Sequence, residues 1–296
     1  MDLKAYLEAR RKRINETLEA LLPPVDTLQK TVVEAMRYSL LAGGKRIRPV
    51  LCLAGAEAVG GDFDGILNFA CAIEMIHAYS LIHDDLPAMD DDDFRRGQPT
   101  NHKKFGEAAA ILAGDGLLTE AFAVMTRRFL YPGVDPWNLL EATQLLAQEA
   151  GFRGMVGGQV VDMEAEDTQP SLELVDFMHA AKTAALIRAS VAGGAILAGG
   201  DRASVSALSE YGRYLGLAFQ IRDDLLDVLG DSRELGKPVG SDEQRKKATY
   251  PAVLGIEESQ RRERRTVELA LNALSEMDAR SDPLRAIAEY LLTRNK

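Results

Sequence analysis

The sequence has only two cysteines and four histidines among its 296 residues, and neither residue type forms a pattern typical of a metal site. Cys52 and Cys71 lie in apolar helical stretches without metal-ligand spacing, which predicts buried free thiols rather than a disulfide. The histidines form neither an HExxH motif nor a Cys/His cluster, which argues against a zinc site. Any bound metal would therefore need oxygen ligands.

An excess of basic residues is also lacking. The chain carries 35 Lys and Arg against 45 Asp and Glu, a formal net charge of -10. Nucleic-acid and anionic-membrane binders neutralise phosphates with surplus positive charge, so neither class fits this composition. An anionic ligand would have to meet a local cluster of cations.

A membrane anchor is not expected either. Residues 1–24 follow an amphipathic helix pattern with charges spread through it, which fits neither a signal peptide nor a membrane span. We also expect no other stretch to be long and apolar enough to span a bilayer. These observations predict a cytoplasmic protein with no membrane span.

Strand patterns are nearly absent, whereas apolar residues recur at helical spacing almost throughout, which predicts an all-α protein. The length would also permit two domains, but the Gly and Pro breaks between helices are short, so we expect a single domain over residues 1–296. Helices are predicted at 3–21, 26–42, 47–59, 64–85, 106–130, 136–150, 154–165, 171–198, 202–229, 242–274 and 282–293.

The segment FQIRDDLLD contains the clearer of two aspartate clusters. Asp223 and Asp227 are four residues apart, and Gln220 precedes Asp223 by three, so all three share one face of a helix. Such a motif alone is equally explained by a solvated helix face. The apolar residues around it favour burial, and buried carboxylates need cations.

The other cluster lies in IHDDLPAMDDDDFRRG, where Asp84 and Asp85 end an apolar helix. Pro87 breaks helical geometry, so Asp90 is expected to project from a turn. Taken alone, this run of aspartates resembles a solvated loop. If the two clusters face each other across a helical bundle, their carboxylates suit magnesium, which takes one or two carboxylates and completes its shell with substrate phosphate and water.

A diphosphate also needs donors, and basic residues stand near predicted helix ends. Each alone is an ordinary surface charge. The chain has neither a P-loop nor a GxGxxG motif, so nucleotide binding is unsupported. The candidate donors are Lys45, Arg48, Arg95, Arg96, Lys182, Lys237 and Lys247.

Six segments occur in an order and spacing that resemble the trans-prenyltransferases, the short-chain isoprenyl diphosphate synthases, and among them the bacterial farnesyl diphosphate synthase type. They are GGKRIRP, EMIHAYSLIHDDLPAMDDDDFRRGQPTNHKKFGE, GMVGGQVVDM, KTAALI, GLAFQIRDDLLDV and LGKPVGSDEQRKKATYP. The resemblance covers almost the whole chain. It implies the all-α isoprenoid synthase fold around a central cavity, diphosphate substrates and a homodimer.

The resemblance also implies roles for individual residues. Asp84, Asp90 and Asp223 would ligate magnesium, with Asp85, Asp224 and Asp227 in support and about three ions per site. Arg95, Lys182, Lys237 and Lys247 would hold the allylic diphosphate. Lys45, Arg48, His77 and Arg96 would hold isopentenyl diphosphate. Thr183, Gln220 and the Lys182 carbonyl would face the allylic cation.

The implied reaction is ionisation of the allylic diphosphate, attack by isopentenyl diphosphate, and proton loss to the released diphosphate. Its product would be farnesyl diphosphate, made from dimethylallyl and then geranyl diphosphate. In the family, a bulky aromatic five residues before the first aspartate forms the floor of the chain pocket, and Tyr79 occupies that position. Ser80 shares a helix face with Asp84. Without the motif, Tyr79 is equally explained as a core aromatic residue.

Three alternatives remain. Geranylgeranyl or geranyl diphosphate synthases differ only in product length. Terpene cyclases also use aspartate-rich metal sites, but they take one diphosphate and need no second basic pocket. A non-catalytic helical scaffold would carry the aspartates as solvated faces and would show no metal-dependent response to diphosphates.

Overall fold

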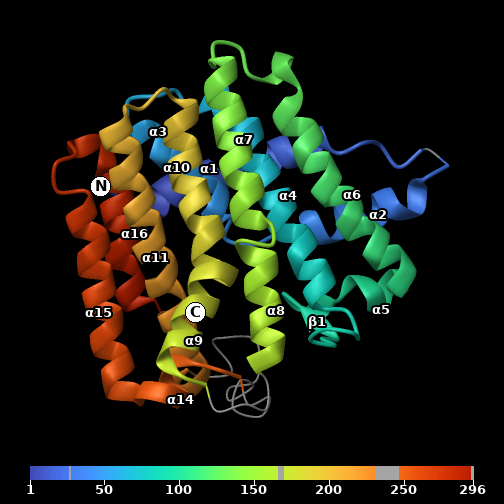
Figure 1. Ribbon diagram of the computed structural model, residues 1–296. Coiled ribbons are helices and arrows are strands. Elements are labelled where there is room, and N and C mark those ends of the chain that lie inside the picture. Colours follow the sequence, from blue (N-terminus) through green and yellow to red (C-terminus); the bar gives the residue numbers. More distant parts are fainter. Residues whose placement is uncertain (27, 166–169, 231–246, 295–296) are drawn as a thin grey trace.

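The computed structural model describes residues 1–26, 28–165, 170–230 and 247–294, and within these ranges the fold is a bundle of helices with one short hairpin (Figure 1). The α-helices are α1 (Leu3–Leu21), α2 (Lys30–Leu40), α3 (Ile47–Ala58), α4 (Leu67–Asp84), α5 (Asn101–Phe105), α6 (Glu107–Thr126), α7 (Pro136–Ala150), α8 (Met155–Ala165), α9 (Leu172–His179), α10 (Ala185–Leu197), α11 (Arg202–Leu229), α14 (Tyr250–Leu254), α15 (Ile256–Ala273) and α16 (Asp282–Thr293). The all-α prediction is confirmed.

Shorter elements join these helices. Single 3-10 turns are η1 (Asp64–Ile66), η2 (Arg128–Leu130) and η4 (Ala279–Ser281), and η3 (Ala180–Ala184) is a π-helical segment. Strands β1 (Phe94–Arg95) and β2 (Gln98–Pro99) pair antiparallel, with Arg95 opposite Gln98.

Helices α4 and α10 form the centre of the bundle. Nearly every residue of α10 is buried, and α4 is apolar on all sides, as expected for a helix surrounded by others. Helix α4 packs against α3 and α6, and α10 packs against α3, α7 and α11. The approach of α3 to α10 requires glycine, because a Cβ on Gly194 would lie 1.9 Å from the carbonyl oxygen of Cys52. Cys52 and Cys71 are buried free thiols here, as predicted.

Three helical stretches are long and apolar enough to cross a membrane, so the expectation that no such stretch exists was wrong. They are Asp64–Asp84, Glu107–Thr126 and Leu172–Leu197. The first and third are central helices of the bundle, 72% and 78% buried over their apolar windows, so core packing explains their composition. The stretch in α6 is only 39% buried, which leaves an apolar face uncovered by the chain itself.

The predicted helices match the structure closely except in two places. The stretch predicted as one helix over 242–274 is divided within its described part, because Thr249 caps α14 and Gly255, at φ 76°, separates α14 from α15. The hairpin and α5 were not predicted, since strands of two residues are too short to show a period.

Candidate active site

The C-terminal end of α4 brings the first aspartate cluster together. Beyond Asp84 the chain turns through Pro87, and the backbone N–H of Asp90 donates to the Asp84 carbonyl oxygen at 2.8 Å. The prediction that Asp90 projects from a turn is therefore confirmed. Burial raises the pKa of Asp84 to about 6, and the negative charge of Asp90 adds to the rise although Lys182 opposes it. A pair of partly desolvated carboxylates at one helix end attracts a cation.

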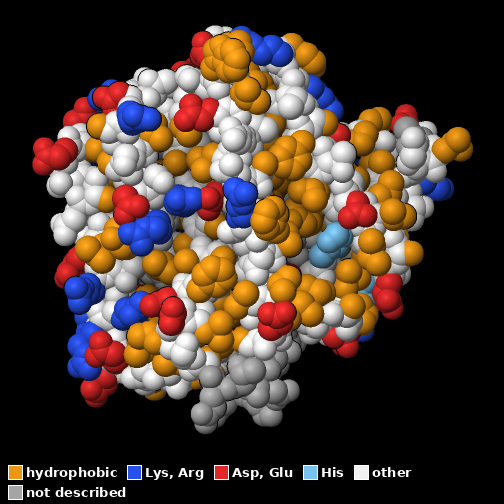
Figure 2. Space-filling model, viewed as in Figure 1, with side chains coloured by type: hydrophobic (Ala, Val, Ile, Leu, Met, Phe, Trp, Pro, Cys, Tyr) orange, Lys and Arg blue, Asp and Glu red, His pale blue; other side chains and the backbone are white. Residues whose placement is uncertain are grey.

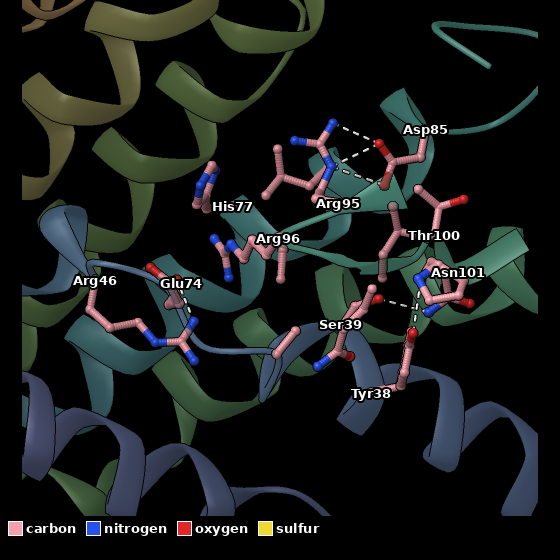
Figure 3. A pocket seen from close by; sticks show the side chains of 16 residues that line it. Tyr38, Ser39, Arg46, Glu74, His77, Asp85, Arg95, Arg96, Thr100 and Asn101 are labelled. Carbon is pink, nitrogen blue, oxygen red and sulfur yellow. Dashed lines mark hydrogen bonds and ion pairs between the residues drawn. The ribbon is translucent and has the colours of Figure 1, made fainter. Parts of the chain in front are cut away.

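The hairpin holds two arginines over this end of α4 (Figure 3). Its two-residue turn, Arg96–Gly97, has φ of 53° and 76°, the left-handed pair of a type I′ turn. Arg95 clamps the buried Asp85, with Nη2 2.6 Å and Nε 2.8 Å from the carboxylate. Arg96 donates to the Gly43 carbonyl oxygen, and a Cβ on Gly44 would lie 2.7 Å from the Arg96 guanidinium. The GG pair thus leaves room for Arg96.

A cavity of about 550 Å³ beside this hairpin is rich in cations. Burial lowers the pKa of Arg48, and the Nε of this residue is buried without a hydrogen-bond partner among the described residues. Burial, together with Arg48 and Arg96, lowers the pKa of His77 well below its usual range, so the ring is neutral and its Nε2 lies 3.3 Å from Arg48 Nη1. The cavity's charged lining also includes Lys45, Arg95, Arg96, Asp223 and Arg294.

A second cavity, of about 400 Å³, adjoins the first and is more apolar. Asp84 and Lys182 line it, together with Tyr79, Ser80, Met155, Val160 and Met163. Lys182 Nζ contacts Asp162 at 2.6 Å; burial opposes its charge, but Asp162 and Asp84 together raise the pKa of the lysine. Four residues line both cavities and mark their junction: Arg48, His77, Leu81 and Thr183.

The π-helical segment η3 places Lys182 and Thr183 at the cavity walls. It interrupts the long helix that α9 and α10 otherwise form, and such segments commonly mark functional sites. Helix α8 approaches it closely, because a Cβ on Gly158 would lie 2.3 Å from the Lys182 backbone nitrogen. Gly158, the last glycine of the GMVGGQ motif, therefore lets α8 lie directly against the Lys182 backbone.

Helix α11 carries the second aspartate cluster, and its three carboxylates have different surroundings. Asp223 is partly exposed, lines the larger cavity and pairs with Arg294 Nη1 at 3.0 Å. Asp224 and Asp227 are each only 2% exposed. Asp224 accepts from Gln220 Nε2 at 2.8 Å and from the Tyr250 backbone N–H at 3.0 Å. Thr183 donates to Gln220 Oε1 at 2.9 Å.

Two predicted diphosphate donors remain, Lys247 and Lys237. Lys247 lies 3.6 Å from Asp90, which links the segment before α14 to the turn after α4. Lys237 lies outside the described residues. Sequence reasoning missed Arg294, Asp162 and Tyr250, each of which contacts a predicted site residue. Arg294 follows the end of α16, where no motif marks a site, and Asp162 lies within the GMVGGQVVDM segment but was not singled out there. Tyr250 acts through its backbone.

Magnesium fits this arrangement better than a metal that needs a complete protein cage. Among the described residues no group of three or more His, Cys, Asp or Glu could hold a metal ion. Magnesium is usually bound by one or two carboxylates and completes its shell with phosphate and water. Asp84 with Asp90 on one side, and Asp223 on the other, supply carboxylates of that kind.

Comparison with known proteins identifies the family. A model of the polyprenyl synthetase family matches residues 29–289. The chain belongs to this family. This polyprenyl synthetase and a farnesyl diphosphate synthase of Escherichia coli are 45% identical over 300 residues, and the match covers 100% of both chains. It is also 45% identical to geranylgeranyl pyrophosphate synthase 11 of Arabidopsis thaliana, over 99% of this chain and 83% of the relative.

A solved structure of similar shape is the geranyltransferase of Helicobacter pylori, complexed with magnesium and isoprenyl diphosphate. The two structures superpose with a TM-score of 0.85 at 31% sequence identity, over 99% of this chain and 97% of the other. This polyprenyl synthetase therefore has the all-α isoprenoid synthase fold and is a trans-prenyltransferase, as its motifs predicted.

Proposed function

We propose that the enzyme condenses isopentenyl diphosphate with dimethylallyl and then geranyl diphosphate to give farnesyl diphosphate and diphosphate. The observation that carries this proposal is the pair of adjoining cavities, each with its own cations and a shared wall. Such a pair suits two diphosphates whose carbon groups must meet. A terpene cyclase takes only one diphosphate, which leaves the cation-rich cavity around Arg48 and Arg96 without a use.

The chain's own residues support a division of labour. Lys45, Arg48 and Arg96 would bind isopentenyl diphosphate in the larger cavity. There the Arg48 Nε, which has no hydrogen-bond partner among the described residues, offers a buried donor. Lys182 and Lys247 would bind the allylic diphosphate beside Asp84 and Asp90. Arg95, which lines the larger cavity and pairs with Asp85 beside Asp84, would join them from the boundary between the two sites. Bound magnesium would neutralise charge that develops on the departing diphosphate, which fixed cations also stabilise. The apolar walls of the smaller cavity keep water from the allylic cation.

Product length follows from the end of the smaller cavity. Tyr79 is 7% exposed, lines this cavity and packs edge-to-face against the His83 ring at 5.7 Å between centroids. Helix α6 packs directly against the His83 ring, since a Cβ on Gly114 would lie 2.1 Å from the His83 Nε2. A rigid floor of this kind favours a C15 product. The relatives named geranylgeranyl pyrophosphate synthase support a C20 product as the alternative.

We also propose a cytoplasmic homodimer. Helix α6 presents Ile111 and Leu112 to solvent, and α7 presents Trp137 and Leu140, which is 56% exposed. Figure 2 shows hydrophobic side chains gathered over the part of the surface where Figure 1 places α6, α7 and α8. Contiguous apolar surface of this kind is typical of an interface. A second copy of the chain is the partner that the family resemblance implies.

Incubation of the enzyme with isopentenyl and dimethylallyl diphosphates, followed by chromatography of the products, tests the proposal. Farnesyl diphosphate should dominate, and excess chelator should abolish turnover. A mainly C20 product would replace farnesyl by geranylgeranyl diphosphate. Turnover without isopentenyl diphosphate would indicate a cyclase instead.

A further inference from the structure

The second aspartate of the DDLLD motif lies in a hydrogen-bond chain rather than at a cavity wall. Asp224 uses both carboxylate oxygens: Oδ1 accepts from Gln220 Nε2 at 2.8 Å, and Oδ2 accepts from the Tyr250 backbone N–H at 3.0 Å. His179 Nε2 also lies 3.2 Å from Oδ2, although it is not aligned as a hydrogen bond. Asp224 is 2% exposed and lines neither cavity, in contrast to its neighbour Asp223.

The partners of Asp224 fix which way the Gln220 amide points. An ionised carboxylate only accepts hydrogen bonds, so the group facing it must be the NH₂ of Gln220. The Gln220 carbonyl then faces Thr183, 2.9 Å away, and Thr183 must donate its hydroxyl hydrogen. The backbone N–H of Tyr250 can only donate, so it fixes the direction of every hydrogen bond in the chain from Asp224 to Thr183.

The orientation of the Thr183 hydroxyl has a consequence at the junction of the two cavities. Thr183 lines both cavities, where an allylic carbon from one side would meet a double bond from the other. Because its hydrogen is directed to Gln220, the hydroxyl turns only lone pairs toward the junction. Fixed dipoles of this kind stabilise a positive charge without reorganisation.

We infer that Asp224 is a positioning residue for the condensation and not a magnesium ligand: it locks the Gln220 amide so that Thr183 presents its oxygen to the allylic cation. This inference rests on the proposed function. Ile221, Leu225 and Met178 belong to the same core cluster as Tyr250 and are each at most 2% exposed, so the Asp224–Tyr250 end of the hydrogen-bond chain is shielded from water. A dry environment strengthens each bond of the chain.

The Asp224→Asn variant tests whether Asp224 fixes the orientation of the Gln220 amide. The side-chain carbonyl of the introduced asparagine keeps the bond to Tyr250 N–H, so its NH₂ faces Gln220 and forces that amide to turn over. Gln220 then donates to Thr183, whose hydrogen turns toward the junction. We expect kcat to fall about 100-fold, the scale of losing one preorganised dipole. Both KM values should stay unchanged, because no diphosphate contact is altered.

Binding of inorganic diphosphate with increasing magnesium, followed by calorimetry, separates this role from metal ligation. Asp224→Asn should show the wild-type magnesium midpoint, whereas the matched control Asp223→Asn should need more magnesium. Thr183→Val should reproduce the loss in kcat, and the Thr183→Val/Asp224→Asn double variant should lose no more than either single variant. If Asp224→Asn does not fold, Gln220→Leu tests the same chain of bonds, both alone and combined with Thr183→Val.

A raised magnesium midpoint in Asp224→Asn, or additive losses in the double variant, would overturn the inference. Wild-type kcat in Asp224→Asn would overturn it too. Failure of the wild-type enzyme to condense the two substrates would instead overturn the proposed function, so the two failures are distinguishable.

Discussion

Lys182, which is half-buried, and Arg96, which is exposed, are both cations near the first aspartate cluster, yet they line different cavities. Lys182 lies in the smaller cavity with Asp84, and Arg96 in the larger one with Arg48. We expect Lys182→Ala to raise KM for the allylic substrate and Arg96→Ala to raise KM for isopentenyl diphosphate. Loss of a charge-assisted bond costs about 1.5–3 kcal/mol, or roughly ten- to a hundredfold in binding.

Steady-state kinetics with each substrate varied in turn checks this division. The exposed Lys12, whose side chain is 78% accessible, provides a control, since Lys12→Ala should change neither KM. Equal effects of Lys182→Ala and Arg96→Ala on both KM values would contradict the assignment of one cavity to each diphosphate.

Individual residues differ in how far the sequence could predict them. The positions of Asp84 at a helix end and of Asp90 in the following turn were predictable from the apolar helix pattern and Pro87, whereas Lys182 was named only through the family resemblance. The different surroundings of Asp223 and Asp224 were not predictable, since adjacent residues on a helix point about 100° apart and only the packing of α14 decides which one is covered. Arg294 gave no signal because its contact with Asp223 joins distant parts of the chain.

Among the elements, the π-helical segment depends most clearly on a single neighbour. Gly158 of α8 lies against the Lys182 backbone, where a Cβ would come within 2.3 Å of the nitrogen and has only backbone to displace. We expect Gly158→Ala to cost about 1–3 kcal/mol of unfolding free energy, typical of overpacking. It should also reduce kcat, because the shift moves Lys182 and Thr183 together.

Gly193→Ala in α10 is the matched control, since its Cβ would make an ordinary 3.7 Å contact with the Phe69 side chain of α4. Chemical denaturation and turnover of both variants check the expectation. If Gly158→Ala matched Gly193→Ala in both measurements, the close approach of α8 would not position the site.

In the proposed function, Tyr79 of helix α4 would form the chain-length floor, about one turn before Asp84. Tyr79→Ala removes the ring that packs on His83, so the product should lengthen toward C20. Ser80→Phe should shorten it toward C10, because Ser80 lines the same cavity and a phenyl group would fill it. The ratio of C10, C15 and C20 products, measured with isopentenyl diphosphate in excess, checks both changes. An unchanged ratio in both variants would contradict the floor.

The helices themselves were largely predictable because their apolar residues recur with a period of 3.6 over long stretches. The hairpin was not, although it carries Arg95 and Arg96. Its structure comes from the left-handed Arg96–Gly97 turn and from contacts with Asp85 and Gly43 that only the folded bundle supplies. Long-range contacts of this kind leave no period in the sequence.

At the scale of the whole molecule, an acidic protein concentrates cations in one place. The net charge is -10, yet the larger cavity gathers Lys45, Arg48, Arg95, Arg96 and Arg294. Glu74 and Asp223 also line this cavity, but cations outnumber them, and such an excess attracts an anionic ligand locally even when the surrounding surface is acidic. The composition correctly required such a local cluster for any anionic ligand, and folding brings it together from separate segments of the chain.

The apolar surface over α6 and α7 predicts association of two chains. The exposed apolar residues of these helices share one side of the bundle (Figure 2), and burying them in an interface removes that surface from water. Light scattering should give about twice the chain mass of 32.3 kDa. Leu112→Glu combined with Leu140→Glu should shift the protein to monomer, because each would bury an unpaired charge at the interface. Leu269→Glu, on α15 away from this face, is the control and should leave the dimer intact. A wild-type monomer, or equal dissociation by the control, would contradict the proposed interface.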